Sequence, residues 1–382
     1  MKIAMLSPYS LSRPGGVQGQ VFGLSRALRR LGHQVTVLGP DDAGEEAGDR
    51  RLEDPDVYVF GEPTGLRSNG SIAPVTVSPL ATMRAERFVR KGGFDVLHLH
   101  EPLAPFAPYG FTATAPLPMV GTYHRAGVSR WVHVLKPLAE LVGRRLQVRV
   151  AVSEAARETG MRSSGGEFEV LFNGVELERF AAAVPVPTDR PTVLFLGRHE
   201  SRKGLNVLLD AFAALDRPAT LWVAGDGPGS EVQRRRHPES DRVHWLGMLS
   251  DDEVASRLVG ADILCAPSLH GESFGMVVLE GMAARCAVVA SDLEGYRSAA
   301  GGHAVLVPPG DVEALSRALG VALADVAEQS GQSSAEALKA AEAHAQNWSM
   351  ESLAERYLGV YARAIELYAA KKGRGRAGRG PG

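Results

Sequence analysis

Short apolar runs alternate with stretches of helical periodicity along most of the chain. The run at residues 2–7 predicts a buried strand. Apolar residues then recur every three or four positions from Val17 to Leu31, which predicts a helix that ends at Gly32. Further strands are predicted at residues 34–38, 56–60, 94–98, 118–122, 149–152 and 169–172. Continuous apolar runs are typical of a parallel sheet covered on both faces, so residues 1–180 are predicted to form a doubly wound α/β domain.

The pattern breaks at residues 181–190, where small residues and prolines predict a linker. The alternation then restarts. Strands are predicted at residues 191–197, 219–224, 243–246, 261–266, 287–291 and 304–307, and helices at residues 205–215 and 274–284. Residues 191–348 are therefore predicted to form a second Rossmann-like α/β domain.

The chain ends in a long predicted helix and a basic tail. One side of the helix, residues 349–370, carries Leu353, Tyr357, Tyr361, Ile365 and Tyr368. Such a stripe usually makes core contacts, and we expect the helix to pack back towards the N-terminal domain. The tail, residues 371–382, is rich in glycine and arginine and is predicted to be disordered.

Composition excludes several classes of protein. The 382 residues, 45% hydrophobic and 23% charged, suit two globular domains. Lys plus Arg is 42 and Asp plus Glu is 44, so no basic field for nucleic acid is expected. Cys265 and Cys286 lie in apolar stretches and cannot build a disulfide framework. No run is long enough to span a membrane, and a strand beginning at residue 2 leaves no room for a signal peptide. We therefore expect a cytoplasmic protein.

Two glycine clusters follow predicted strands. Gly15 and Gly16 precede a helix, where the backbone can approach a ligand and free N–H groups favour phosphate. The spacing does not match the G-x-G-x-x-G signature, which argues against an NAD enzyme. The cluster at residues 225–229 is weaker, and either cluster could also be an ordinary turn.

Cations and carboxylates occur at two strand ends of the second half. Arg198, Arg202 and Lys203 follow one strand, where they suit a diphosphate; a solvated basic loop is the alternative. Glu272 precedes a predicted helix and Glu280 lies on it, with seven residues between them. Carboxylates accept hydrogen bonds from sugar hydroxyls, so together these residues indicate a sugar-nucleotide site.

The combination resembles glycosyltransferase family 4, whose GT-B fold has two facing Rossmann-like domains with a cleft between them. Within the family the chain is most similar to the actinobacterial phosphatidylinositol mannosyltransferases. The resemblance spans nearly the whole chain, and it is carried by residues 8–18, 69–71, 94–102 and 271–275.

The resemblance implies a set of site residues. It implies that the donor is bound by Gly16, Arg198, Arg202, Lys203, Ser273, Phe274, Gly275, Met276 and Glu280. It implies that Glu272 and His124 lie at the reacting centre. Tyr9, Gln18 and Asn69 are implied to line the acceptor site.

The implied reaction is a retaining transfer of a hexose, mannose from GDP-mannose, to phosphatidylinositol. Arg198, Lys203 and a helix N-terminus could neutralise the leaving diphosphate. No Asp-x-Asp is placed for a metal, so none is expected in the protein, although Mg²⁺ could stimulate the reaction. Without an obvious nucleophile, front-face attack is favoured. His124 could act through its backbone carbonyl or by orienting a hydroxyl, and both roles are left open.

A short basic amphipathic stretch suggests contact with an anionic membrane. Residues 83–91 carry Arg84, Arg87, Arg90 and Lys91. Such a helix can lie on the inner face of the plasma membrane without spanning it, and a solvated helix face is the alternative.

The sequence also departs from the resemblance. Ser68 replaces an expected Tyr, and an expected Arg is missing near Pro74. Arg125 and Ala126 stand where a Thr-Ser pair is expected, and Val254 replaces an expected Lys. Another nucleotide sugar or acceptor is therefore a further hypothesis. An epimerase or phosphorylase on the same architecture, and a non-catalytic nucleotide-sugar-binding scaffold, are the other two.

Overall fold

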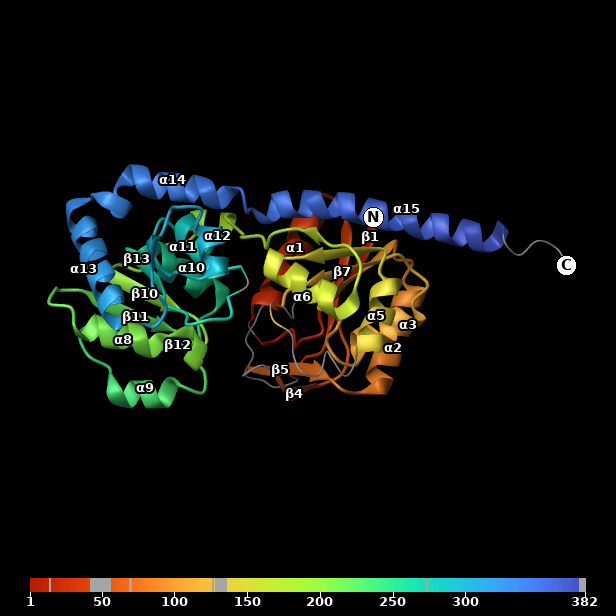
Figure 1. Ribbon diagram of the computed structural model, residues 1–382, viewed down its shortest axis with the longest axis horizontal. Helices are drawn as coiled ribbons and strands as arrows, with labels where there is room; N and C mark the ends of the chain where they lie inside the picture. The colour runs from red at the N-terminus through yellow and green to blue at the C-terminus, as the bar shows by residue number, and fades with distance from the viewer. Residues whose placement is uncertain are drawn as a thin grey trace. The chain divides into compact units, whose positions relative to one another are not determined.

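The computed structural model describes residues 1–13, 15–41, 56–68, 71–125, 127, 136–272 and 274–377; for residues 66–68, 71–73 and 374–377 it describes the backbone. The chain divides into two compact units (Figure 1). Unit 1 is Met1–Gly174 with Met350–Gly382, and unit 2 is Val175–Ser349. The expected linker at residues 181–190 lies inside unit 2, where Val186 donates its backbone N–H to the Ser256 carbonyl. The long C-terminal helix belongs to unit 1.

Unit 1 is built on a parallel seven-stranded sheet, as the continuous apolar runs predict. In spatial order its strands are β3 (Val57–Val59), β2 (Gln34–Gly39), β1 (Lys2–Leu6), β6 (Val96–His100), β7 (Met119–Tyr123), β8 (Val148–Ala151) and β9 (Glu169–Val170). The strand order reverses between β1 and β6. Open α/β sheets bind ligands at the carboxyl ends of strands beside such a reversal.

Helices flank this sheet. They are α1 (Gly16–Arg30), α2 (Pro79–Lys91), α3 (Ala107–Thr114), α5 (Lys136–Arg145), α6 (Glu154–Ser164) and α15 (Met350–Ala377). One core cluster joins the sheet to α2 and α3 through residues such as Leu97, Phe111 and Ala85. α15 packs against α1, β6, β7 and β8, and it is helical through Ala377, within the tail that the sequence predicts to be disordered.

Two features of unit 1 differ from the sequence predictions. The strand predicted at residues 94–98 is β6 and begins at Val96, because the Asp95 carboxylate accepts the Lys2 backbone N–H at 2.7 Å just before it. An antiparallel hairpin, β4 (Pro63–Ser68) and β5 (Ser71–Thr76), was not predicted. Gly65 in β4 and Pro74 in β5 obscure the alternation that marks a strand.

Unit 2 repeats the plan with a parallel six-stranded sheet. In spatial order its strands are β12 (Val243–Gly247), β11 (Thr220–Ala224), β10 (Thr192–Leu196), β13 (Ile263–Ala266), β14 (Ala287–Ser291) and β15 (Val305–Val307). Here the order reverses between β10 and β13. The loop that follows β10 carries the predicted donor-binding residues Arg198, Arg202 and Lys203, and the loop that follows β13 leads to the predicted donor-binding residues of α11.

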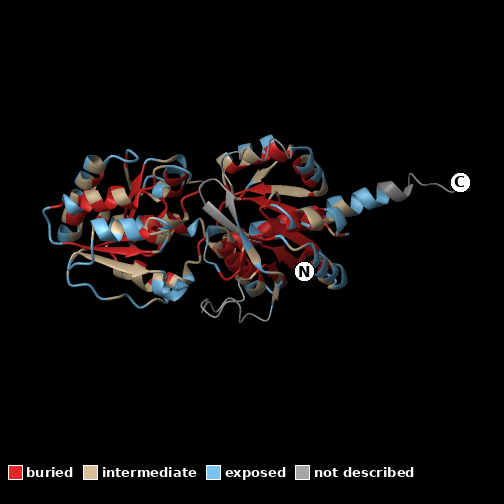
Figure 2. Ribbon diagram, turned by 90° about the horizontal axis from the view of Figure 1, so that it is seen from below, coloured by how far each residue is buried: buried red, intermediate tan, exposed pale blue. Residues whose placement is uncertain are grey.

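Helices also flank the sheet of unit 2. They are α7 (Glu178–Ala181), α8 (Leu205–Ala213), α9 (Ser230–Arg236), α10 (Asp251–Gly260), α11 (Met276–Ala283), α12 (Glu294–Ala300), α13 (Val312–Glu328) and α14 (Ala335–Gln346), with 3₁₀ turns η2 (Ser201–Lys203) and η3 (Gly331–Ser333). Leu208 and Leu319, from α8 and α13, pack on the buried strands. In Figure 2 the strands at the centre of each unit are largely buried, and the helices expose their outer faces.

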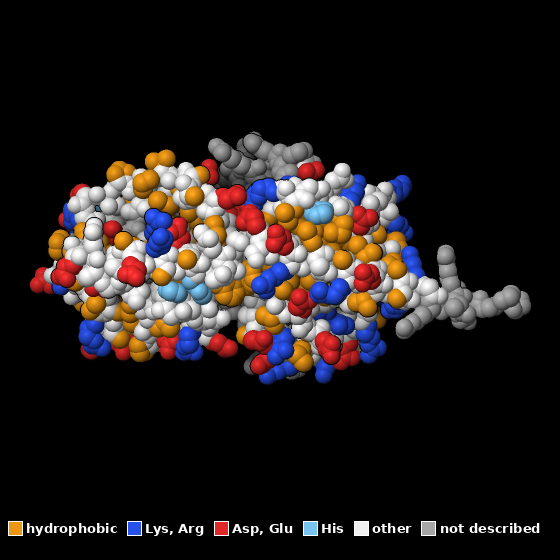
Figure 3. All heavy atoms as spheres, turned by 90° about the horizontal axis from the view of Figure 1, so that it is seen from above, with side chains coloured by type: hydrophobic (Ala, Val, Ile, Leu, Met, Phe, Trp, Pro, Cys, Tyr) orange, Lys and Arg blue, Asp and Glu red, His pale blue; other side chains and the backbone are white. Residues whose placement is uncertain are grey.

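Within the described residues, each helix is too short or too polar to cross a lipid bilayer. On the face drawn in Figure 3, acidic and basic side chains are interspersed, in keeping with a net charge of -2.

Candidate functional site

The loops that follow β10 and β13 bring four of the predicted residues of unit 2 together. The Glu272 carboxylate accepts hydrogen bonds at one oxygen, Oε1, from Lys203 Nζ at 2.6 Å, Arg202 at 3.3 Å and the Ser268 hydroxyl at 3.0 Å. Arg198 lies 3.2 Å from Glu200, whose carboxylate also accepts from Arg202 Nε at 2.9 Å. We call these residues the donor cluster: Arg198, Glu200, Arg202, Lys203, Ser268 and Glu272.

The donor cluster contains three cations, and most of its side chains are largely shielded from solvent. The Lys203 and Glu272 side chains are 20% and 12% exposed, and that of Arg198 is 50% exposed. Three cations lie beside two carboxylates. An incoming diphosphate can therefore compete with the two carboxylates for these cations.

Gly275 sets the start of helix α11. It lies in the left-handed region, with φ of 82°, and a Cβ there would lie 2.7 Å from Tyr296 Cδ1. Because Gly275 precedes the helix, α11 begins at Met276, two residues later than predicted. Phe274 is buried and its ring meets that of Trp348 edge-on at 4.9 Å. The backbone N–H groups at the start of α11 thus follow directly on the donor cluster.

Glu280 has a partner that the sequence did not suggest. Arg179 of α7 donates to Glu280 Oε1 at 2.7 Å. Burial raises the pKa of Glu280, and the charge of Arg179 opposes that shift. Residues Ser273 and Asn69 lie outside the described residues, so their predicted roles remain predictions.

The glycine cluster at residues 225–229 packs against the backbone of the loop that follows β10. Gly225 has φ of 113°, and a Cβ on it would lie 2.0 Å from the Gly197 carbonyl oxygen. Gly229 donates its backbone N–H to the His199 carbonyl at 2.9 Å. These close backbone approaches explain the glycines as structural parts of the turn.

The second cluster lies in unit 1, at the carboxyl ends of β1, β6 and β7. Tyr9 follows β1, and its hydroxyl is hydrogen bonded to Arg125, whose charge also acts on Glu101. The Glu101 carboxylate accepts the backbone N–H of His124. Burial raises the pKa values of both Tyr9 and Glu101. We call Tyr9, His100, Glu101, His124 and Arg125 the histidine cluster.

Other predicted residues of unit 1 lie around the histidine cluster. Gly16 is the first residue of α1, and open space surrounds the position that a Cβ would take. The Gln18 side chain is buried and donates to the Ser10 carbonyl at 3.1 Å, which fixes the loop that carries Tyr9. Pro74, a point of departure from the resemblance, accepts the Ser10 backbone N–H at 2.9 Å.

Several members of the clusters were not predicted as site residues. Glu200 lies between two predicted arginines, and Glu101 is the fourth residue of the His-x-His-Glu run at residues 98–101, so a signal was present for both. Ser268 gave no such signal, and neither did Arg179, the partner of Glu280. Their contacts arise only when the chain is folded.

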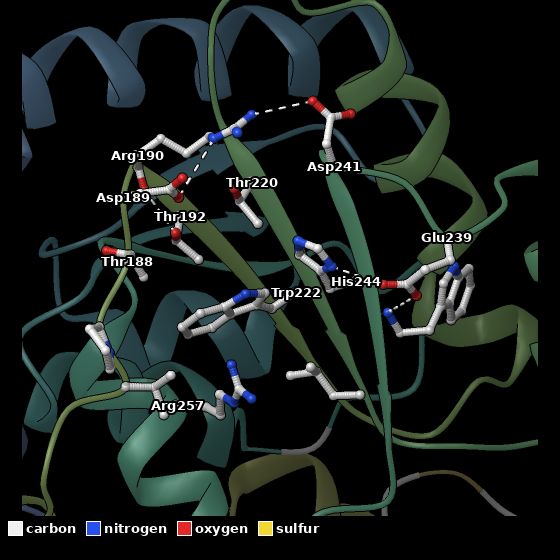
Figure 4. Close-up of a pocket in the computed structure, with 14 residues that line it drawn as sticks. Thr188, Asp189, Arg190, Thr192, Thr220, Trp222, Glu239, Asp241, His244 and Arg257 are labelled. Atoms are coloured by element: carbon white, nitrogen blue, oxygen red, sulfur yellow. Dashed lines mark hydrogen bonds and ion pairs between the residues drawn. The ribbon is translucent and has the colours of Figure 1, made fainter.

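A pocket of about 560 Å³ lies elsewhere in unit 2 (Figure 4). It lies towards the amino ends of β10, β11 and β12, where Trp222 packs under the Arg257 guanidinium and Thr192, Thr220 and His244 line the wall. The donor cluster lies at the carboxyl ends of the strands. The pocket is therefore not part of the donor site.

Comparison with known proteins identifies the family. Family models described as "Glycosyltransferase Family 4" and "Glycosyl transferases group 1" match residues 14–179 and 190–325. The phosphatidyl-myo-inositol mannosyltransferase of Mycobacterium tuberculosis is 36% identical over 339 residues, which cover 84% of this chain and 86% of that protein. The Mycobacterium leprae enzyme of the same name is 37% identical over 342 residues, covering 84% of this chain and 86% of that enzyme. The chain belongs to glycosyltransferase family 4.

Solved structures support the fold of this glycosyltransferase. HepE of Anabaena, crystallised with UDP and glucose, matches with a TM-score of 0.74 at 20% identity, covering 95% of this chain and 99% of that chain. The sucrose-phosphate synthase of Thermosynechococcus elongatus matches with a TM-score of 0.72 at 22% identity, covering 97% and 100%. The predicted GT-B fold, with two Rossmann-like α/β domains, is confirmed.

The buried histidines make the stability of unit 1 sensitive to acid. Burial lowers the pKa values of His98 and His124 to about 3 and that of His100 well below its usual range. Below about pH 6.5 the unfolded chain binds protons that the folded chain does not. Stability present above pH 6.5 is therefore lost on acidification, by up to about 1.4 kcal/mol per pH unit for each histidine.

We expect the substitution H98Q to make the free energy of unfolding less dependent on pH. Urea titrations at pH 7 and pH 5 should give a smaller difference in the free energy of unfolding for H98Q than for the wild type. The exposed His270 provides the matched control, since H270Q should leave the difference unchanged. An equal pH dependence in the wild type and H98Q would contradict the assignment of neutral buried histidines.

Proposed function

We propose that this glycosyltransferase transfers mannose from GDP-mannose to phosphatidylinositol at a membrane surface, with retention of the anomeric configuration. The observation that carries the proposal is the donor cluster, in a chain 36% identical to phosphatidyl-myo-inositol mannosyltransferases. The transferred mannose and the acceptor in this proposal follow the name of those relatives, and GDP as the carrier of the mannose follows the family resemblance.

The donor cluster suits the leaving diphosphate. Arg198 and Lys203 bind the phosphates, and the N–H groups at the start of α11, four residues after Glu272, provide further donors to them. Glu272, released from Lys203 and Arg202 as these cations engage phosphate, accepts hydrogen bonds from hydroxyls of the transferred sugar. Glu280 binds the ribose of the donor, and Arg179 holds its carboxylate in place.

The histidine cluster suits the acceptor and the reacting centre. The leaving phosphate removes the proton of the acceptor hydroxyl while the new bond forms on the same face of the sugar. The His124 side chain is neutral, because burial lowers its pKa to about 3. It therefore serves as a hydrogen-bonding group for the sugar and does not supply a positive charge. Tyr9 and Arg125 face the acceptor.

Release of GDP tests the proposal. Purified protein is mixed with GDP-mannose and vesicles that either contain or lack phosphatidylinositol, with UDP-glucose in parallel arms. GDP release that depends on phosphatidylinositol, with no comparable UDP release, supports the proposal. Absence of release in every arm would contradict phosphatidylinositol as the acceptor, and absence of release with soluble inositol 3-phosphate as well would favour a non-catalytic nucleotide-sugar-binding scaffold.

A soluble inositol phosphate is a second candidate acceptor. Arg125 supports it, because a cation beside Tyr9 suits a phosphorylated acceptor better than the Thr-Ser pair that the family resemblance leads one to expect. A D-inositol 3-phosphate glycosyltransferase of Xylanimonas cellulosilytica is 28% identical over 420 residues, covering 97% of this chain and 98% of that protein. GDP or UDP release with inositol 3-phosphate in place of vesicles would favour this acceptor.

Helix α2 provides the membrane contact in this proposal. Ala81, Ala85 and Val89 are buried, while Leu80 and Met83 are 67% and 62% exposed. The exposed basic side chains of the helix are Arg84, Arg87, Arg90 and Lys91. Exposed apolar and basic groups on one helix suit an anionic lipid surface.

Replacing those four basic residues by Gln is expected to weaken binding to anionic vesicles at least about tenfold, because each contributes about 1 kcal/mol near such a surface. Co-sedimentation with vesicles of phosphatidylinositol in phosphatidylcholine measures the change. Replacing Arg234, Arg235 and Arg236 of α9 by Gln is the control and should have little effect. Equal weakening by both sets would contradict a specific role for α2.

A further inference from the structure

Three histidines and two tyrosines form a continuous row inside unit 1. His98 and His100 lie on β6, and their rings are 4.2 Å apart. His100 Nδ1 is 2.9 Å from His124 Nε2, at the end of β7, and the two rings stack at 5.2 Å. The His124 ring, which belongs to the proposed reacting centre, is thus hydrogen bonded to His100, and the His100 ring packs on that of His98.

The far end of the row is fixed by the C-terminal helix α15. His98 Nδ1 is hydrogen bonded to the Tyr361 hydroxyl at 2.9 Å, and His98 Nε2 to the Thr122 hydroxyl at 2.7 Å. Thr122 is in turn hydrogen bonded to the Tyr357 hydroxyl at 2.8 Å. His98 is therefore held at both ring nitrogens. His98 packs against His100 and limits rotation of that ring.

Each of these histidines carries a single proton. His98 and His100 are buried, and burial lowers the pKa values of all three rings far below neutrality. In the hydrogen bond between His100 and His124, one ring must therefore donate and the other must accept.

A buried nitrogen of His100 decides the direction of that bond. Among the described residues, His100 Nε2 has no hydrogen-bond partner. A proton on Nε2 would be a buried N–H without an acceptor, which proteins avoid more strongly than a bare acceptor. The His100 proton is therefore placed on Nδ1, from which it is donated to His124 Nε2.

We infer that His100, steadied by His98 and Tyr361, sets His124 in the tautomer that carries its proton on Nδ1. Given the proposed function, His124 then offers an N–H donor to a substrate oxygen, and its other nitrogen is unable to act as a base. The Glu101 carboxylate holds the backbone N–H of His124, so both the main chain and the ring are fixed. His98, His100 and Tyr361 are positioning residues that act through His124.

The tautomer can be measured without any substrate. In protein labelled with ¹⁵N-histidine, proton–nitrogen correlation spectra distinguish the two neutral tautomers, and loss of a signal in H124Q assigns His124. We expect a proton on His124 Nδ1 in the wild type and in H100N, whose side-chain amide can donate from the same place. We expect a mixture of tautomers in H100L. A proton on His124 Nε2 in the wild type, or unchanged His124 signals in H100L, would overturn the inference.

Activity provides a second readout. H100L is expected to lower kcat by about tenfold to a hundredfold, with KM for the donor changed less than about twofold, and H100N is expected to restore most of kcat. Y361F removes one hydroxyl and serves if H100L fails to fold; it should shift the His124 tautomer towards a mixture. If Y361F keeps the wild-type tautomer of His124, the positioning role assigned to His98 and Tyr361 is overturned. If no mannosyl transfer is found at all, the proposed function fails, and the spectra still decide the tautomer.

Discussion

Replacing Glu272 by Gln is expected to lower kcat for hexosyl transfer at least about a hundredfold, equivalent to about 2.7 kcal/mol of transition-state stabilisation. In the structure this carboxylate holds Lys203 at 2.6 Å and Arg202 at 3.3 Å. An amide has nearly the same shape, but it has no charge to hold the cations and is a weaker acceptor for sugar hydroxyls. Steady-state kinetics with the donor and acceptor measures the loss.

The matched control is Glu313 on α13, whose side chain is 89% exposed. E313Q should leave kcat unchanged, because Glu313 is not part of the donor cluster. Its exposed ion pair with Arg317 also contributes little to stability. Near-ultraviolet circular dichroism of E272Q should match that of the wild type. If the kcat of E272Q lies within about threefold of the wild-type value, Glu272 does not act at the reacting centre.

Replacing Lys203 by Met is expected to weaken donor binding at least about tenfold and to lower kcat about a hundredfold, because the leaving diphosphate loses a cation in a protected site. Methionine keeps most of the length of the side chain. Calorimetric titration with GDP-mannose measures the affinity, and initial rates at saturating donor measure kcat.

K339M is the control for this substitution. Lys339 is exposed on α14, and its replacement should change neither quantity. If K203M binds the donor as tightly as the wild type and reacts as fast, the diphosphate does not lie at the donor cluster.

The sequence predicts most of the fold because the strands of both sheets are covered and therefore appear as continuous apolar runs. Boundaries depend on finer contacts, as the later starts of β6 and α11 illustrate. The hairpin β4–β5 was missed because Gly65 and Pro74 interrupt the pattern. The sequence carries no signal for an antiparallel pair that is short and partly exposed.

The donor cluster was more predictable than the hydrogen bonds within it. Arg198, Lys203 and Glu272 follow strands beside the reversal of the strand order, so topology alone places them near one another. By contrast, Arg179 meets Glu280 across 101 residues of chain, and Tyr361 meets His98 across 263. Contacts of this kind depend on how helices pack, which periodicity does not determine.

The most direct measurement is the mass spectrum of the lipid recovered after the purified protein has been incubated with GDP-mannose and phosphatidylinositol vesicles. The account predicts a product heavier than phosphatidylinositol by one mannosyl residue, absent when E272Q replaces the wild type. Unmodified lipid with the wild-type protein, under conditions where GDP-mannose is bound, would contradict phosphatidylinositol as the acceptor.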